Sequence, residues 1–365
     1  MGRYSLTELT LYFLKLGTVG FGGPVALIGY MHRDLVEDRK WIDETDYRDG
    51  LALAQLAPGP LAAQLAIYLG YVHHGVLGAT ASGLAFVLPS FLMVVGLGFA
   101  YQLYGGLDWM EGVFYGVGAC VIGIIAVSAY RLTRKTVGKD RLLWAVYASA
   151  LLVTAITESE RIGLFVAAGL LVWVVKTRPR IRVMRMLAVP PALLWKIFVF
   201  FGEAGAFVFG SGLAIVPFLY GGVVKEYGWL NDRQFIDSVA VAMITPGPVV
   251  ITVGFIGFLV AGISGAIVAA TATFLPCYLF TVIPAPYFKK YGKRSDVAAF
   301  VNGVTVAATG TIAGAVIVLG RRSVVDLPTA FVALTSATLL LRTKKVSEPV
   351  IVLAAASFGL LHRLF

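Results

Sequence analysis

Charged residues are scarce in this sequence. Asp, Glu, Lys and Arg make up 14% of its 365 residues, against about 25% in soluble proteins. Hydrophobic residues reach 58%, and the mean hydropathy is +0.84. A soluble chain could not hide so much apolar surface, so the composition excludes a soluble enzyme and a disordered chain. The hydrophobic stretches have the length of transmembrane helices, about 17–25 residues, rather than that of barrel strands. We therefore expect an all-α polytopic membrane protein.

Cysteine and histidine are also rare. The two cysteines, Cys120 and Cys277, lie in apolar stretches and indicate neither a disulfide framework nor a metal site. The sequence has no His-Glu-x-x-His motif, nucleophile elbow or Walker A motif. We therefore expect no enzymatic activity, no metal and no cofactor. The net charge of +10 fits positively charged loops on one side of a bilayer better than nucleic-acid binding.

The sequence contains two copies of one unit. At an offset of 188 residues, Gly17, Phe21 and Trp41 match Gly205, Phe209 and Trp229. At an offset of 187 the match continues from Gly75, which meets Gly262, to Arg134, which meets Arg321. Chance similarity between apolar stretches would not keep these residues in register. We predict an N-terminal repeat over 1–187 and a C-terminal repeat over 188–365, joined by the basic linker 176–192.

Each copy predicts a helix broken at a glycine-rich motif, followed by a helical pair broken at Pro-Gly-Pro. In copy one the first helix covers about 8–30, and Ser5 and Glu8 have the spacing of a capping box. Two arms of about 12–14 residues then flank Pro58-Gly59-Pro60. Each arm is roughly 18–21 Å long and reaches only the middle of a bilayer. We expect a re-entrant hairpin there, then spans near 75–100, 110–130, 141–157 and 162–176.

The distribution of basic residues supports this hairpin. With five crossings in each half, 21 Lys and Arg residues lie in the loops of one side and 7 on the other. If 50–72 crossed as one kinked helix, they would divide equally, against the positive-inside rule. Five crossings also make the second repeat inverted relative to the first. We predict ten crossings, both termini outside the cell, and two opposed hairpins that meet near mid-membrane, as in secondary transporters.

The motifs resemble those of the chromate ion transporter family in its long, two-domain form. The resemblance extends over nearly the whole chain and is carried by Phe21-Gly22-Gly23-Pro24, Gln55-Leu56-Ala57-Pro58-Gly59-Pro60, Phe209-Gly210-Ser211-Gly212 and Pro246-Gly247-Pro248. It implies a secondary transporter in the plasma (inner) membrane that exports chromate from the cytoplasm, with sulfate as a competitor or alternative substrate. A homodimer is compatible with this class.

A tetrahedral dianion that crosses a bilayer needs fixed hydrogen-bond donors in place of water. Helix N-termini supply free N–H groups and partial positive charge, and glycine lets the ligand approach the backbone. The alternative is that the glycines and prolines only mark kinks and close helix contacts. Polar side chains near the motifs add further donors. The candidate substrate-binding residues are Lys15, Gly22, Gly23, Pro24, Gln55, Pro58, Gly59, Pro60, Leu61, Ala62, Gln64, Gly210, Ser211, Gly212, Thr245, Pro246, Gly247 and Pro248.

Two ionisable residues lie inside apolar segments at equivalent positions of the copies, Lys15 and Glu203. Such groups are costly and usually face a partner or a wet pathway. In one interpretation Lys15 attracts the dianion and Glu203 carries a coupling proton. In the others the two form an ion pair, or Lys15 snorkels to the membrane surface.

Two other functions share some of these features. A passive anion channel has every feature named so far, and only flux kinetics separates it from a transporter. A membrane-embedded enzyme acting on lipid or peptide is disfavoured by the absence of a catalytic motif or of paired Asp residues in a span.

Overall fold

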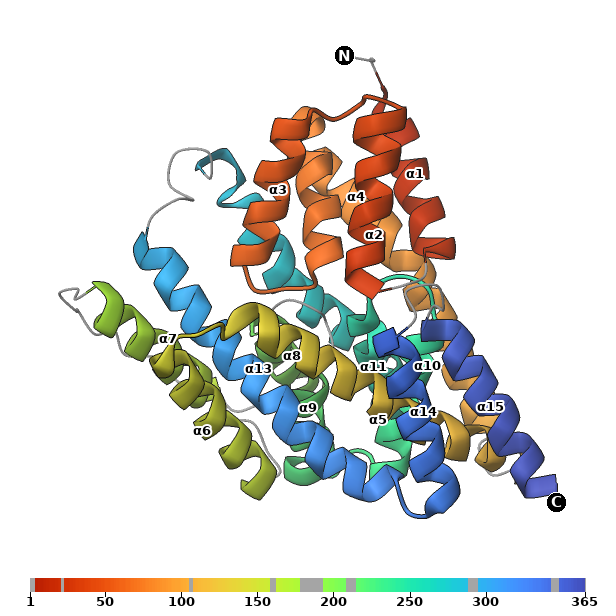
Figure 1. The fold of residues 1–365 in the computed structure, drawn as a ribbon. Helices are drawn as coiled ribbons and strands as arrows, with labels where there is room; N and C mark the ends of the chain where they lie inside the picture. The colour runs from red at the N-terminus through yellow and green to blue at the C-terminus, as the bar shows by residue number, and fades with distance from the viewer. Residues whose placement is uncertain are drawn as a thin grey trace.

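The computed structural model describes residues 4–20, 23–104, 108–157, 162–177, 193–207, 215–287, 295–342 and 348–364. Every regular element in these ranges is a helix (Figure 1). In the first half they are α1 (Leu6–Val19), α2 (Gly23–Met31), the π-helix η1 (His32–Asp38), α3 (Glu44–Leu56), α4 (Leu61–Tyr104), α5 (Asp108–Thr136), α6 (Arg141–Thr157) and α7 (Ile162–Thr177). In the second half they are α8 (Leu193–Ala206), α9 (Ile215–Tyr220), the π-helix η2 (Gly221–Glu226), α10 (Asp232–Ile244), the 3₁₀-helix η3 (Val249–Ile251), α11 (Thr252–Val282), α13 (Ser295–Ser323), α14 (Leu327–Arg342) and α15 (Glu348–Leu364).

The apolar helices confirm an all-α, multi-pass membrane protein. Among the described residues, four helical stretches are long and apolar enough to cross a bilayer, and four shorter apolar helices accompany them. The same sequence of lengths occurs in each half of the chain. The long stretches are Leu61–Tyr104, Glu111–Arg134, Val249–Tyr287 and Asn302–Ser323, and the short ones are Arg141–Thr157, Leu164–Lys176, Leu327–Arg342 and Glu348–His362.

The first predicted crossing, 8–30, is wrong, because this segment folds back on itself. Its helix α1 begins with the predicted Ser5–Glu8 capping box but ends at Val19. At 14 residues, α1 is about 21 Å long, too short to cross a core of about 30 Å. After the glycine-rich break, α2 and η1 return, and the Tyr4 ring stacks on Trp41 with centroids 5.1 Å apart. The break is therefore a reversal of the chain rather than a kink.

The equivalent segment of the second half also folds back. Phe200 of α8 stacks on Phe218 of α9, with ring centroids 5.2 Å apart, and lies 5.9 Å from the ring of Trp229. The expected count of five crossings in each half therefore included a segment that does not cross.

α3 and the first part of α4 form a second antiparallel pair. A Cβ on Gly50 would lie 2.4 Å from the Tyr68 ring, so the two helices approach closely. At the end of this pair Gly75, with φ 56°, turns the chain into the long second part of α4. Gly262 makes the same turn in α11 with φ 61°. The two turns are 187 residues apart, which is the offset found in the sequence.

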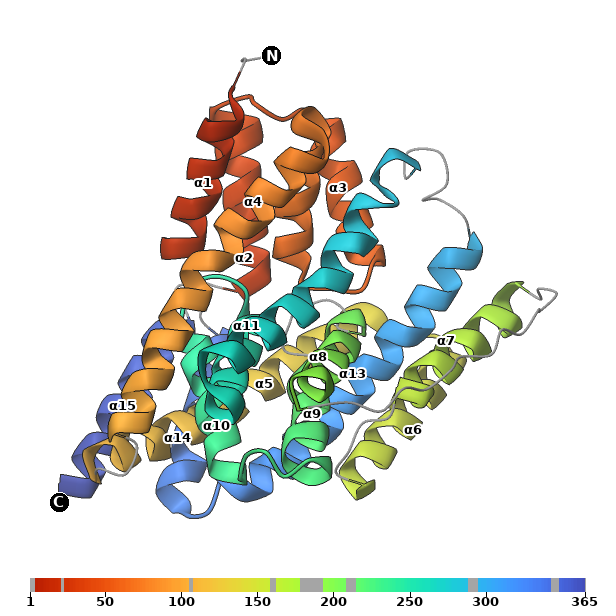
Figure 2. The same ribbon diagram turned by 180° about the vertical axis from the view of Figure 1, so that it is seen from behind.

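The two halves are interlocked in the long helices. A Cβ on Gly116 of α5 would lie 1.9 Å from the carbonyl oxygen of Ala355 in α15. The equivalent Gly303 of α13 approaches Ala168 of α7 in the same way, at 2.6 Å. Each half thus covers its partner's long helix with its own last helices, and α5 and α13 lie at the centre (Figures 1 and 2).

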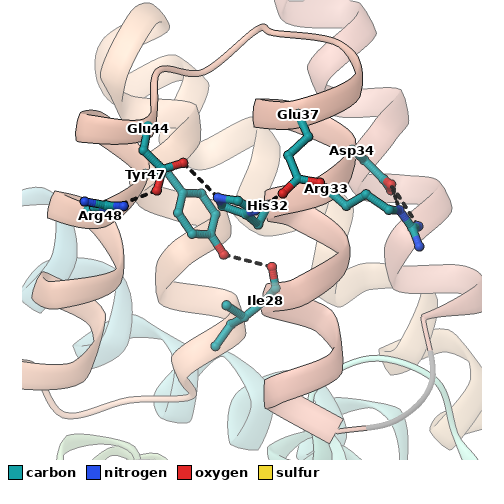
Figure 3. Close-up of polar contacts among 8 residues, drawn as sticks. All are labelled: Ile28, His32, Arg33, Asp34, Glu37, Glu44, Tyr47 and Arg48. Atoms are coloured by element: carbon teal, nitrogen blue, oxygen red, sulfur yellow. Dashed lines mark hydrogen bonds and ion pairs between the residues drawn. The ribbon is translucent and has the colours of Figure 1, made fainter.

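A polar cluster fixes the end of α2, η1 and α3 that lies away from the other half (Figure 3). His32 contacts Glu44 at 2.8 Å and Glu37 at 3.1 Å, and Arg48 donates to Glu44 at 2.7 Å. The hydrogen bonds from His32 and Arg48 hold the pKa of the Glu44 carboxyl below its usual value. Tyr47 donates to the carbonyl oxygen of Ile28 at 2.8 Å, which ties α3 to α2.

Candidate functional site

Three helix N-termini meet at one small cavity between the two halves. They belong to α2, to α4 and to η3, which leads directly into α11. The cavity has room for about one water molecule. Its lining residues come from the first turns of these helices and from the turns before them: Pro24, Leu27, Pro60, Leu61, Ala62, Gly247, Pro248, Val249 and Val250.

Proline precedes or opens each of these N-termini. Pro24 is the second residue of α2, Pro60 precedes α4, and Pro248 precedes η3. Proline favours the start of a helix because its φ is fixed and it lacks the N–H group that would be unpaired there. The first N–H groups after each proline have no acceptor within their own helix. Three positive helix ends therefore lie at a cavity that carries no basic side chain in its lining.

The turn between α3 and α4, residues 57–60, is called here the first tip. Its Gly59 has a φ of 141°, which glycine adopts without strain. Gln64, in the first turn of α4, is completely buried and donates from Nε2 to the carbonyl oxygen of Pro58 at 2.8 Å. The Gln64 Oε1 atom has no hydrogen-bond partner. The first tip thus has its own internal bond and one free buried acceptor beside it.

The turn between α10 and η3, residues 245–248, is the second tip. Gly247, with φ 97°, donates its N–H to the carbonyl oxygen of Gly20 at 3.0 Å. A Cβ on Gly247 would lie 2.0 Å from Ser90 Oγ. The second tip is therefore seated against α1 and α4 of the first half, at the point where α1 ends.

The first tip makes the reciprocal contact with the second half. A Cβ on Gly59 would lie 3.1 Å from the Cβ of Cys277 in α11. Ser90 and Cys277 are 187 residues apart and so occupy equivalent positions of the two copies. Each tip therefore packs on the corresponding helix of the other half, and the cavity lies between them.

The structure brings together the predicted residues of the tips and helix starts. Six of them line the cavity: Pro24, Pro60, Leu61, Ala62, Gly247 and Pro248. Others belong to the tips or to the adjoining helix starts without lining it: Gly23, Pro58, Gly59, Gln64, Thr245 and Pro246. Gly22, Gly210, Ser211 and Gly212 lie outside the described residues.

The charged and polar candidates away from the tips are not part of the cavity. Lys15, Gln55 and Glu203 are all exposed side chains, and none lines it. Lys15 and Glu203 are both described, and they do not form the ion pair considered from the sequence. On α1 and α8 the buried face is apolar, so both ionisable groups point away from the core.

Sequence reasoning missed the apolar lining residues and the helix positions that receive the tips. Leu27, Val249 and Val250 line the cavity without any polar feature to mark them. Ser90 and Cys277 follow Pro89 and Pro276, which the duplication had already aligned. The offset itself was therefore the signal that could have identified them.

These features define a class: a multi-pass α-helical membrane protein whose helix N-termini gather at a cavity between its halves, as in secondary transporters. The sequence model described as chromate transporter matches residues 7–183 and again residues 195–360. The chain therefore belongs to the chromate transporter family, and this membership supports transport of chromate.

Named relatives agree over almost the full length. The chain is 66% identical to the chromate transport protein of Cupriavidus metallidurans, covering 98% of this chain and 93% of that protein. It is 64% identical to the probable chromate transport protein of Synechococcus elongatus, covering 98% and 96%. It is 28% identical to the chromate transport protein of Pseudomonas aeruginosa, covering 97% and 92%. No solved structure matches the chain. Relatives named as transporters favour transport over enzymatic catalysis.

Proposed function

We propose that this protein is a secondary transporter that exports chromate across the plasma membrane and binds the oxyanion between the two tips. The observation that carries the proposal is the convergence of three helix N-termini, from both halves, on one cavity. Three sets of free N–H groups and three positive helix ends suit a doubly negative ligand, which would then need no lysine or arginine in the site.

Binding requires the tips to separate. The cavity holds about one water molecule, which is too little for a tetrahedral oxyanion with its four oxygens. The second tip is held to the first half by the Gly247–Gly20 hydrogen bond and by packing against Ser90. We infer that the described conformation is closed and that the tips move apart to admit the substrate.

We also propose that the two tips are those of re-entrant hairpins entering from opposite sides of the membrane, within repeats 1–187 and 188–365. The reciprocal packing of Gly59 on Cys277 and of Gly247 near Ser90 supports this arrangement. The odd number of crossings in each half no longer supports the inverted arrangement, because the segment 8–30 was counted as one of those crossings. The placement of both termini outside the cell came from the same charge count, which put the N-terminus opposite loop 31–49, whereas the stacking of Tyr4 on Trp41 puts the start of the chain on the side of that loop. Single cysteines placed in 31–49 and in 221–238 should be labelled from opposite sides, and labelling from one side would remove the inverted arrangement.

Export could be driven by the membrane potential. Moving one charge through 100 mV corresponds to about 2.3 kcal/mol, so a dianion leaving a negative interior gains about 4.6 kcal/mol. Sulfate, which is also a tetrahedral dianion, is the expected competitor. A passive channel would show flux that does not saturate and no counterflow, whereas a transporter would show both saturation and counterflow.

The site is tested by removing one backbone donor. Proline is tolerated in the first turn of a helix and lacks the N–H group. Ala62→Pro changes the second residue of α4, and Thr45→Pro changes the second residue of α3, at an exposed position away from the cavity. In proteoliposomes, Ala62→Pro should raise the chromate concentration needed for half-maximal flux by about tenfold, the effect of about 1.4 kcal/mol. Thr45→Pro should leave it unchanged, and equal effects of the two substitutions would refute the site.

A further inference from the structure

One carboxyl group outside the tip cavity is buried in a part of the molecule that should move with the second tip. Asp237 of α10 is 2% exposed, and the Tyr101 hydroxyl donates to its Oδ2 atom at 2.7 Å. A carboxylate buried at this level is costly unless it is compensated by donors. The equivalent residue of the first copy, Asp49, is half-buried and accepts no such hydrogen bond from another described residue. The burial of Asp237 is thus a feature of one copy only.

Asp237 lines a cavity of about 310 Å³ together with several charged side chains. The charged and titratable groups around Asp237 come from α4, α5, α10 and α13, and both arginines have other carboxylates as partners. Arg233 contacts Glu111 at 2.9 Å, and Arg322 contacts Asp232. Within the described part of the chain, the carboxylate of Asp237 therefore accepts a hydrogen bond from the Tyr101 phenol and forms no ion pair with either arginine. The groups are Tyr101 of α4, Glu111 and Tyr115 of α5, Asp232 and Arg233 of α10, and Arg322 of α13.

Asp237 is mechanically connected to the substrate site. It precedes Pro246 by nine residues on the arm that carries the second tip, about 13 Å along the helix. The next residue, Ser238, accepts a hydrogen bond at its carbonyl oxygen from Thr252 Oγ1 at 2.9 Å, which joins the two arms of the tip. Tyr101 belongs to α4 of the other half. The Tyr101–Asp237 bond therefore fastens the arm of one tip to the opposite half.

On the basis of the proposed function, we propose that Asp237 binds the proton whose movement is coupled to oxyanion transport, and that the Tyr101–Asp237 hydrogen bond fastens the second tip while the carboxylate is ionised. A proton delivered by water in this cavity converts the carboxylate to a neutral acid. The bond from Tyr101 then loses its charge-assisted character and weakens. The α10 arm is released from α4, and the second tip can leave Gly20. Loss of the proton restores the bond.

Glu203, the coupling residue suggested from the sequence, is less suited to this task. It is exposed and does not line either cavity. A group that changes charge can drive a conformational change only if its surroundings differ between the two states. Asp237 meets this condition through its interhelix bond, whereas Glu203 has no comparable contact to gain or lose among the described residues.

Chromate uptake and internal pH are measured together in proteoliposomes that contain a trapped pH-sensitive dye. The wild type should move protons together with chromate. Asp237→Asn should keep downhill chromate flux but lose the associated proton movement and the pH dependence of flux. The matched control Asp49→Asn should keep both. Tyr101→Phe should keep coupling but move the midpoint of the pH profile upward, because the ionised carboxylate loses its donor.

The outcomes separate this inference from the proposed function. If the wild type moves no chromate, the proposed function is wrong. If it moves chromate without protons, or if Asp237→Asn still moves protons as the wild type does, coupling through Asp237 is wrong while transport stands. Should Asp237→Asn fail to give a monodisperse protein, the Tyr101→Phe profile decides, and an unshifted midpoint overturns the inference.

Discussion

Adding one methyl group at the second tip should impair transport far more than adding the same group at an equally unusual backbone position elsewhere. Gly247 has φ 97°, so Gly247→Ala costs about 1–2 kcal/mol in backbone strain. The new Cβ would lie 2.0 Å from Ser90 Oγ and 3.1 Å from Ser90 Cβ. The hydroxyl must rotate away, which adds about 1 kcal/mol. The seated tip should therefore be weakened by about 2–3 kcal/mol, or roughly 30- to 150-fold in its equilibrium constant.

Gly262→Ala is the matched control. Its φ is 61°, but nothing lies within 4 Å of the added carbon, so only the backbone strain applies. Initial rates of labelled chromate uptake and thermal unfolding in detergent measure both variants. Ser90→Ala in the Gly247→Ala background should recover part of the loss, because it removes the crowded oxygen. If Gly247→Ala behaves like Gly262→Ala, or if Ser90→Ala gives no recovery, the tip is not seated as described.

Three further substitutions, the first with a matched control, test contacts within the first half of the chain. Gly70→Ala should lower the unfolding temperature in detergent, because its Cβ would lie 2.2 Å from the carbonyl oxygen of Gly78 in the second part of α4, whereas Gly96→Ala, with open space around it, should not. Gln64→Leu removes a buried hydrogen bond within the first tip and should destabilise the protein by about 1–2 kcal/mol and reduce chromate uptake. Glu44→Gln should destabilise the protein at neutral pH but not in acid. The pKa of Glu44 is lowered chiefly by the hydrogen bond from His32. The stabilisation by the Glu44 carboxylate is therefore present above the usual glutamate pKa and is lost as the pH falls through the lowered value. Unfolding temperatures of the wild type and of Glu44→Gln are measured from neutral to acidic pH. A difference between them that persists in acid would refute this prediction.

Local signals in the sequence predicted where helices begin and end. The capping box at Ser5–Glu8 is present, and α3 and α4 stop and start around Pro58-Gly59-Pro60. These signals act within one helical turn, so they need no knowledge of the fold. The direction of the chain after a break is different. The motif at 20–24 is compatible with a kink or a reversal, and packing against α4 decides between them.

In the candidate site, too, local sequence signals identified some residues, whereas the position of others depends on packing between distant segments. The tip residues converge because Gly and Pro dictate the backbone there, and the duplication doubles the signal. The charged candidates Lys15 and Glu203 were selected for lying in apolar segments, but which face of a helix is buried depends on neighbours far along the chain. Asp237 was overlooked because its segment has an ordinary polar helix start. Its burial depends on Tyr101, 136 residues away in the sequence.

The packing of the first tip on Cys277 provides a native chemical sensor. This thiol is completely buried beside Gly59, and the remaining cysteine, Cys120, is buried elsewhere and can be replaced by serine. Alkylation of Cys277 by a small maleimide would then occur only when the tip lifts from α11. The rate of alkylation with and without oxyanion would follow the opening and closing of the substrate site in the protein without any engineered label.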